Sequence, residues 1–168
     1  MTKLGWETLF DDKLTGTGTE IDSGTITAKK FLYVSILVVK VGSSENSPSF
    51  RFNGDDGTNY PIRRANNGAA DDTFTTTYDF LYNGYGGTNT NRQQEMYIIN
   101  EADKMKLCIL NGSQGMGSGS GTAPDTNYMW GKWTNTTDQI TQIVFHGQDF
   151  SLANRLGADT QMIILGTD

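Results

Sequence analysis

The sequence is short of the residues from which catalytic, metal and disulfide chemistry is built. It contains one cysteine, Cys108, and one histidine, His146, in 168 residues. A single cysteine excludes an intrachain disulfide and a cysteine-based zinc site, so core packing alone must stabilise the fold. We interpret Cys108, which lies between Leu107 and Ile109, as a small buried hydrophobe. We interpret His146 as a structural or surface residue of a strand, not as part of a Ser-His-Asp or Cys-His centre.

Proline, charge and long apolar runs are also scarce. There are 3 prolines and 19% charged residues, and the net charge is -6. An acidic chain without a Lys/Arg cluster is poorly suited to a phosphate backbone, so we expect no nucleic-acid partner. The longest apolar run, residues 31–41, is much shorter than the roughly 20 residues of a membrane helix. We expect no membrane partner, and we expect synthesis in a cytoplasm, because no secretory signal is visible.

The residues that are abundant favour strands and turns. Glycine contributes 20 residues, and Thr, Asn, Ser and Asp fill much of the remainder. Residues 31–41 form the strongest expected strand. Their apolar side chains occupy both parities, which is typical of a strand covered on both faces or of a central strand in a sandwich. Residues 50–53 and 59–64 flank the turn at 54–57 and predict a hairpin, in which Pro61 indicates an edge strand.

Turn residues recur every 8–15 positions, which indicates about nine or ten short strands and little or no helix. No linker or repeat divides the chain, so residues 1–168 are expected to form one domain. We therefore predict an all-β, two-sheet antiparallel sandwich of jelly-roll type. The other expected strands are residues 6–10, 21–27, 73–82, 96–99, 105–110, 128–133, 140–146 and 161–165.

Acidic turns are the remaining candidates for chemistry. The pairs at 11–12, 55–56 and 71–72 lie in expected loops, where adjacent carboxylates stay solvated and do not form a glycosidase pair. Asn53, Asp55 and Asp56 provide the oxygen-rich turn chemistry that calcium prefers, without the distal glutamate of an EF-hand. An ordinary turn is the better interpretation. We expect no enzyme activity and no cofactor, with calcium at this turn as the one weak candidate.

Loop-borne aromatics and a Gly/Ser tract at residues 111–125 are the candidate contact surfaces. Aromatic side chains in such positions dock in a partner's pocket or stack on sugars. Trp130 and Trp133 differ in parity, so we expect one to face the core and the other to face out. The candidate partner-contact residues are Tyr82, Tyr85, Trp130, Gly115, Met116 and Gly117.

Several short motifs resemble small β-rich virion proteins of tailed bacteriophages. They are GWETL at 5–9, RFNGDDGTNY at 51–60, GKWTNTTDQI at 131–140 and MIILG at 162–166. The resemblance runs nearly end to end and brings no catalytic residue with it. It implies a jelly-roll virion component, often trimeric, that is located in the virion and binds the major capsid protein or other virion proteins.

Capsid decoration, as a cement protein on the outer shell, is the function that this resemblance favours. A tail-fibre or head-fibre module that binds a host receptor, such as a surface glycan, is the alternative. A carbohydrate-binding module outside any virion is a further alternative.

Overall fold

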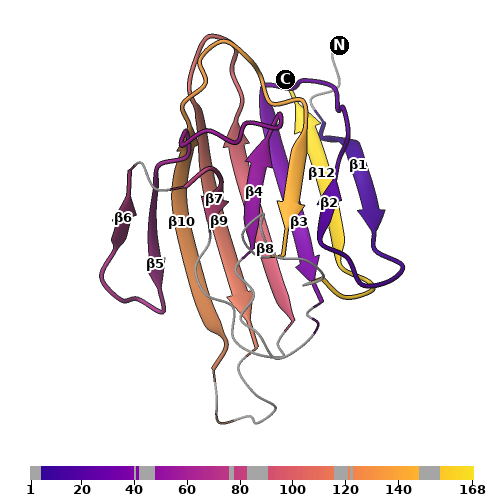
Figure 1. Cartoon of the computed structure of the whole chain (residues 1–168), viewed down its shortest axis with the longest axis vertical. Coiled ribbons are helices and arrows are strands. Elements are labelled where there is room, and N and C mark those ends of the chain that lie inside the picture. Colours follow the sequence, from indigo (N-terminus) through magenta and orange to yellow (C-terminus); the bar gives the residue numbers. More distant parts are fainter. Residues whose placement is uncertain are drawn as a thin grey trace.

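Two antiparallel sheets packed face to face form the described part of the chain (Figure 1). The structure is a computed structural model, and it describes residues 5–39, 41, 48–75, 78–82, 91–115, 121, 123–147 and 156–168. These residues contain twelve strands and no helix. The predicted all-β, two-sheet antiparallel sandwich is confirmed, with slightly more strands than expected.

The larger sheet has eight strands in the order β1-β12-β3-β8-β9-β10-β5-β6, and the smaller has four in the order β2-β11-β4-β7. In the larger sheet the strands are β1 (Glu7–Lys13), β12 (Gln161–Thr167), β3 (Phe31–Val38), β8 (Arg92–Ile99), β9 (Lys106–Gln114), β10 (Asp125–Trp133), β5 (Ile62–Asn66) and β6 (Asp72–Phe74). In the smaller sheet they are β2 (Glu20–Asp22), β11 (Ile143–His146), β4 (Ser49–Phe52) and β7 (Leu81–Tyr82).

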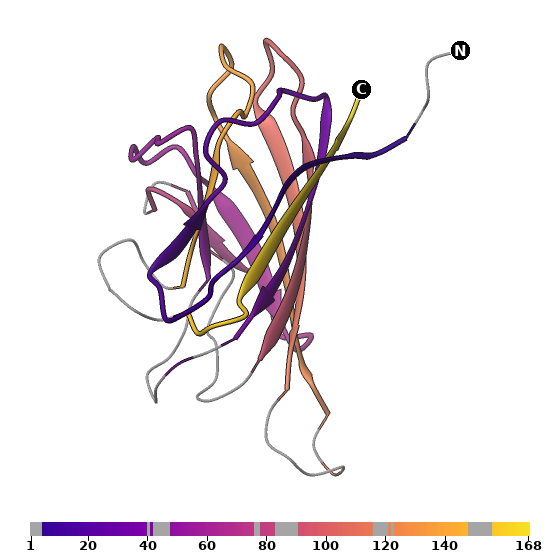
Figure 2. The same ribbon diagram turned by 90° about the vertical axis from the view of Figure 1, so that its right-hand side faces the viewer.

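The core lies between the two sheets, which Figure 2 shows from the side. Successive side chains of a strand point to opposite faces, so every second residue of β3 and β8 is buried, as is every second residue of β9 except the half-buried Gly112. The smaller sheet covers this inner face with β11, all four residues of which are buried, and with Phe50 and Phe52 of β4. Cys108 is buried as expected, and His146 is also buried.

Asn100 ties three segments together at the end of β8. Its side chain is fully buried. The amide nitrogen donates hydrogen bonds to the carbonyl oxygens of Lys29 (3.0 Å) and Ile140 (3.1 Å), and the amide oxygen accepts one from the backbone N–H of Ile140 (2.7 Å). One side chain therefore satisfies backbone groups that precede β3 and β11.

Two predictions about the segment from 50 to 64 are wrong. β4 and β5 do not form a hairpin, because β4 pairs with β11 and β7 in the smaller sheet, whereas β5 pairs with β10 and β6 in the larger one. The turn between them carries the chain from one sheet to the other. Pro61 does not mark an edge strand. It precedes β5, where its missing N–H costs no hydrogen bond of the ladder.

Residues 31–41 were interpreted as a strand covered on both faces or as a central strand of a sandwich, and the structure agrees with the second interpretation. The structure describes its residues Phe31–Val38 as β3, which is central in the larger sheet but which the described residues cover fully on one face only. Phe31 and Leu37 are exposed on the other face, and Tyr33 is half-buried there. The apolar residues of that second parity therefore need another explanation.

Candidate functional site

The face of the larger sheet that points away from the smaller sheet is called the outer face here. Strand pairing aligns its side chains in rows that cross the sheet. Phe31, Ile99 and Leu107 form one row across β3, β8 and β9. Tyr33, Tyr97, Ile109 and Trp130 form the next row, which extends to β10. Alternation in four neighbouring strands thus places two apolar rows side by side.

Exposed large hydrophobic side chains gather on this face. Within the described ranges ten of them are exposed by more than a third. The period of two in each strand, or contact with Tyr33 in the case of Trp6, assigns nine of them to the outer face, and Met105 lies just before β9. Soluble proteins expose single apolar residues routinely, so it is their concentration on one face that is informative. The ten are Trp6, Phe31, Leu37, Tyr97, Ile99, Met105, Leu107, Ile109, Tyr128 and Trp130.

The outer face is hollowed over the two apolar rows. A depression of about 510 Å³ lies there, between Trp6 and Trp130. The ring of Trp6 meets that of Tyr33 edge-on at 6.4 Å, and Tyr33 packs against Tyr97 at 4.9 Å. These ring contacts hold rigid aromatic surface at the depression, as in the central pockets of protein interfaces.

Toward the other end of the strands the same face becomes polar. A second hollow of about 280 Å³ is lined mainly by amide, hydroxyl and carboxylate groups, together with the ring of Tyr128. Tyr128 is stacked beside Trp130, with ring centroids 6.5 Å apart and planes 19° apart. Burial raises the pKa of Tyr33, and its hydrogen bond to the Glu95 carboxylate raises that pKa further. The polar lining consists of Gln93, Glu95, Asn111, Ser113 and Thr126.

Charge is scarce in the centre of the outer face, whereas the flanking strands carry Asp11 and Lys13 on β1 and Arg63 on β5. The outward positions of β12, β3, β8, β9 and β10 carry one acidic residue, Glu95, and one basic residue, Lys132. The two cancel, although the whole chain has a net charge of -6. Charge depletion with aromatic enrichment distinguishes the centre of protein interfaces from ordinary surface.

The predicted contact residues are distributed unevenly in the structure. Trp130 lies on the outer face and Trp133 in the core, which confirms the expected division between the two. Gly115 is exposed just beyond β9. Tyr82 is half-buried on β7 and packs against the Arg64 guanidinium, 4.8 Å from its ring centroid. Tyr85, Met116 and Gly117 lie outside the described residues.

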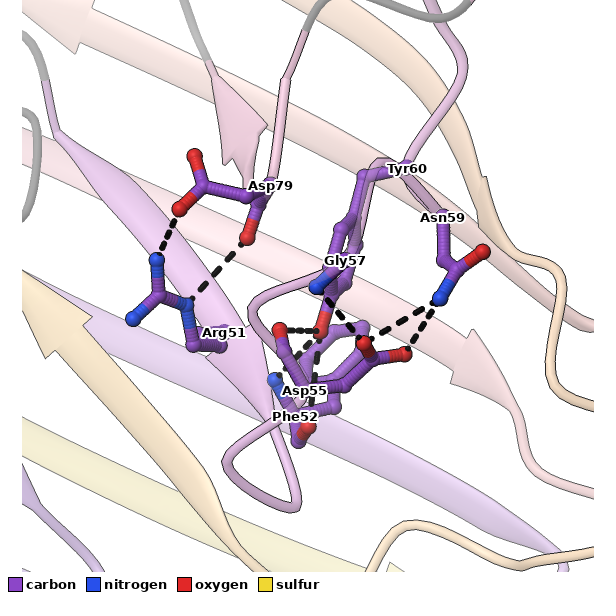
Figure 3. Close-up of polar contacts among 7 residues, drawn as sticks. All are labelled: Arg51, Phe52, Asp55, Gly57, Asn59, Tyr60 and Asp79. Atoms are coloured by element: carbon purple, nitrogen blue, oxygen red, sulfur yellow. Dashed lines mark hydrogen bonds and ion pairs between the residues drawn. The ribbon is translucent and has the colours of Figure 1, made fainter.

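At the turn considered for calcium, the carboxylate oxygens of Asp55 accept hydrogen bonds from N–H groups. The Asp55 carboxylate accepts hydrogen bonds from the indole of Trp133 (2.6 Å), from the backbone N–H of Gly57 (2.9 Å) and from the amide of Asn59, and the last two are drawn in Figure 3. The hydroxyl of Tyr60 donates to the carbonyl oxygen of Asp55 (3.0 Å). This geometry favours the interpretation as an ordinary turn.

The other two calcium candidates do not strengthen the site. The side-chain oxygen of Asn53 accepts hydrogen bonds from the N–H groups of Thr141 and Gln142, and Asp56 is exposed. Among the described residues no three His, Cys, Asp or Glu side chains are grouped as a metal ion would need. Calcium at this turn stays a prediction.

The bonds to Asp55 predict a pH dependence. Burial alone would raise the pKa of Asp55, but the hydrogen bonds from Trp133, Gly57 and Asn59 outweigh it and hold that pKa below its usual value. Stability from the ionised carboxylate is therefore present above about pH 4 and is lost as the pH falls through the folded-state pKa. We expect the urea midpoint to fall on acidification from pH 6 to 3, and to fall less in Asp55→Asn than in the matched control Asp56→Asn. Equal slopes in the two variants would contradict this assignment.

Most residues of the outer face were not among the contact residues predicted from the sequence. Ile99, Leu107, Ile109 and Tyr97 were expected as parts of strands, without an orientation. The available signal was the apolar occupation of both parities at residues 31–41 and 105–110. No helix in the described part of the chain is long and apolar enough to cross a membrane. The chain matches no protein-family model, and no curated protein matches it significantly.

Proposed function

We propose that this protein is a structural subunit of a larger protein assembly, that it acts by binding and not by catalysis, and that it docks through the outer face. The observation that carries the proposal is the gathering on that face of nine of the ten exposed large hydrophobic side chains of the described residues. Burial of such a surface against protein is the main favourable term in association.

The size of the apolar surface supports a protein as the ligand. A fully buried aromatic side chain covers about 150–250 Å², so nine large side chains that are roughly half exposed present about 700 Å². The largest apolar patch of an ordinary monomer is about 300–600 Å². A specific protein interface buries about 800 Å² on each partner. The outer face therefore has the area of an interface and exceeds that of an ordinary surface.

The resemblance to phage virion proteins gives the proposal its setting. Within that setting capsid decoration is the first candidate, and a tail-fibre or head-fibre module is the alternative. Decoration requires a rigid surface that stays apolar until it meets its neighbour. The aromatic contacts around Trp6, Tyr33 and Tyr97 provide such a surface.

Quantitative mass spectrometry of purified virions tests this function. If the chain is a decoration protein, its peptides occur at tens of copies or more in each particle, and adding the protein to undecorated capsids raises their melting temperature by mass action. A fibre module would occur at far fewer copies and would leave capsid melting unchanged. Absence of the chain from purified particles would overturn the virion assignment.

Glycan binding is a second candidate, and the polar hollow favours it. Amide, hydroxyl and carboxylate groups beside the stacked rings of Tyr128 and Trp130 can bind the hydroxyls and the apolar face of a sugar. We expect Tyr128→Ala to weaken any glycan affinity, measured by calorimetry, by at least about tenfold, the loss of roughly one aromatic contact. Ile99→Thr, at the apolar end, is the control and should leave that affinity unchanged. Equal effects of the two changes would contradict a site in the polar hollow.

A further inference from the structure

The chemistry of the outer face also points to its occupant. We infer that a second copy of this chain covers the apolar rows of the outer face, so that the functional unit is a homo-oligomer. The inference deepens the proposed function, because it assigns a partner to the same docking surface.

The charge distribution favours a copy over an oppositely charged partner. Two copies present identical charges, so a face with an excess of either sign would repel itself. Lys132 follows Leu107 on β10 and Arg63 of β5 follows Trp130, so both cations lie at the β10 end of the apolar rows, and the middle of the rows, around Tyr97 and Ile109, carries no charge. The net charge of -6 therefore arises away from this surface. A partner selected by complementary charge would find little on this face to recognise.

The area and composition of the face fit a stable self-interface. Seven of the exposed hydrophobic side chains lie at the apolar end, and by the same estimate they present about 550 Å² of apolar surface, most of the roughly 800 Å² that one partner contributes to a standard interface. Interfaces between identical chains are also more apolar than those of transient complexes. The two apolar rows, from Phe31 to Leu107 and from Tyr33 to Trp130, supply such a surface without interruption by a charged side chain.

The sequence of β3 adds an independent argument. Strands that are apolar on both parities are typically covered on both faces. The smaller sheet covers the parity of Leu32, Val34 and Ile36, and nothing in the described residues covers Phe31 completely. Sheets stack face to face at about 10 Å with interdigitated side chains. A second copy stacked on the apolar rows would give β3 the second layer that its sequence predicts.

The polar hollow indicates which part of the outer face the second copy leaves uncovered. Rows that contain Glu95, Asn111 and Ser113 lie beyond the apolar rows on the same strands. Burying those groups without hydrogen-bond partners would cost free energy. The contact is therefore centred on the apolar end, around Ile109, and the polar end stays accessible to solvent.

Light scattering on the full chain, after size-exclusion chromatography at about 10–100 µM, tests the inference. The chain has a mass of 18.4 kDa. We expect a mass of two chains, because a face that packs on the same face of a second copy closes as a pair. A mass of three chains would match the trimer that the resemblance implies and would overturn the stacked pair. Ile109→Lys should reduce the mass to that of one chain, because it places a cation at the centre of each apolar surface. Ser113→Lys introduces the same cation on the same strand and face but at the polar end, and it should retain the oligomer.

The outcomes separate the inference from the proposed function. A wild-type mass of one chain over the whole concentration range would overturn the second copy, and virion incorporation would still decide the function. An oligomer that survives Ile109→Lys would place the contact elsewhere and also overturn the inference. Circular dichroism shows whether that variant is folded. If it is not, Tyr97→Lys replaces it with the same expected loss of the oligomer.

Discussion

Replacing Asn100 with alanine is expected to lower the free energy of unfolding by about 4 kcal/mol, because two buried and one partly buried backbone groups lose their partners and a buried group costs about 1–3 kcal/mol when unsatisfied. The affected groups are the carbonyl of Lys29 and the N–H and carbonyl of Ile140. No water can replace the amide easily, since Asn100 is fully buried. The loss approaches the whole stability of a marginal domain, about 5–15 kcal/mol.

Urea denaturation followed by circular dichroism measures this effect at one fixed protein concentration, so that any oligomer contributes equally. Asn111→Ala is the matched control. It removes the same amide from an exposed position on β9, where a change within about 0.5 kcal/mol is expected. Similar losses in the two variants would show that the hydrogen bonds of Asn100 do not stabilise the fold as described.

Replacing Trp133 with alanine is expected to cost about 4 kcal/mol, within the usual 3–5 kcal/mol for truncating a buried Trp or Phe. Trp133 is 1% exposed, and its ring meets that of Phe52 edge-on at 6.0 Å. Its indole N–H also donates to the Asp55 carboxylate at 2.6 Å. The change therefore leaves a cavity between the sheets and removes one bond from the turn that joins β4 to β5.

Trp133→Phe separates the two contributions. It keeps most of the ring volume and removes the hydrogen bond to Asp55, so we expect a loss of about 1–2 kcal/mol in the same denaturation experiment. The indole bond also helps to hold the pKa of Asp55 low, so the acid-induced loss of stability should be smaller in Trp133→Phe than in the wild-type protein. An alanine variant no less stable than the phenylalanine variant would contradict the role of Trp133 in packing.

Local patterns predicted the strands well because the period of two is a local property. Residues 128–133 illustrate this. The opposite parity of Trp130 and Trp133 was enough to predict that one faces solvent and the other the core. The turn at residues 54–57 shows the limit. Its composition predicts a reversal, but a hydrogen bond that holds it in place comes from Trp133, 78 positions from Asp55 along the chain. Partners so far apart leave no local signal.

The candidate site was harder to predict for a related reason. Trp130 was selected because it lies near a glycine-rich tract, whereas Leu107 and Ile109 were expected simply as residues of a strand. Their exposure depends on which parity the smaller sheet covers, and that depends on the order of strands in both sheets. Only the apolar occupation of both parities in β3 and β9 pointed to a second covered face. The sequence pattern is the same whether that face is covered by another part of the chain or by a partner protein.

The edges of the two sheets determine what kind of assembly is available. β1, at one edge of the larger sheet, exposes Glu7, Asp11, Asp12 and Lys13, and β6, at the other edge, has three residues. β2 and β7, the edges of the smaller sheet, have three and two residues. Charged or very short edges resist the addition of further strands. Open-ended growth of the sheets into fibres is therefore disfavoured, and association is directed to a face that closes once it is covered. A protein built in this way can be present at high concentration without polymerising.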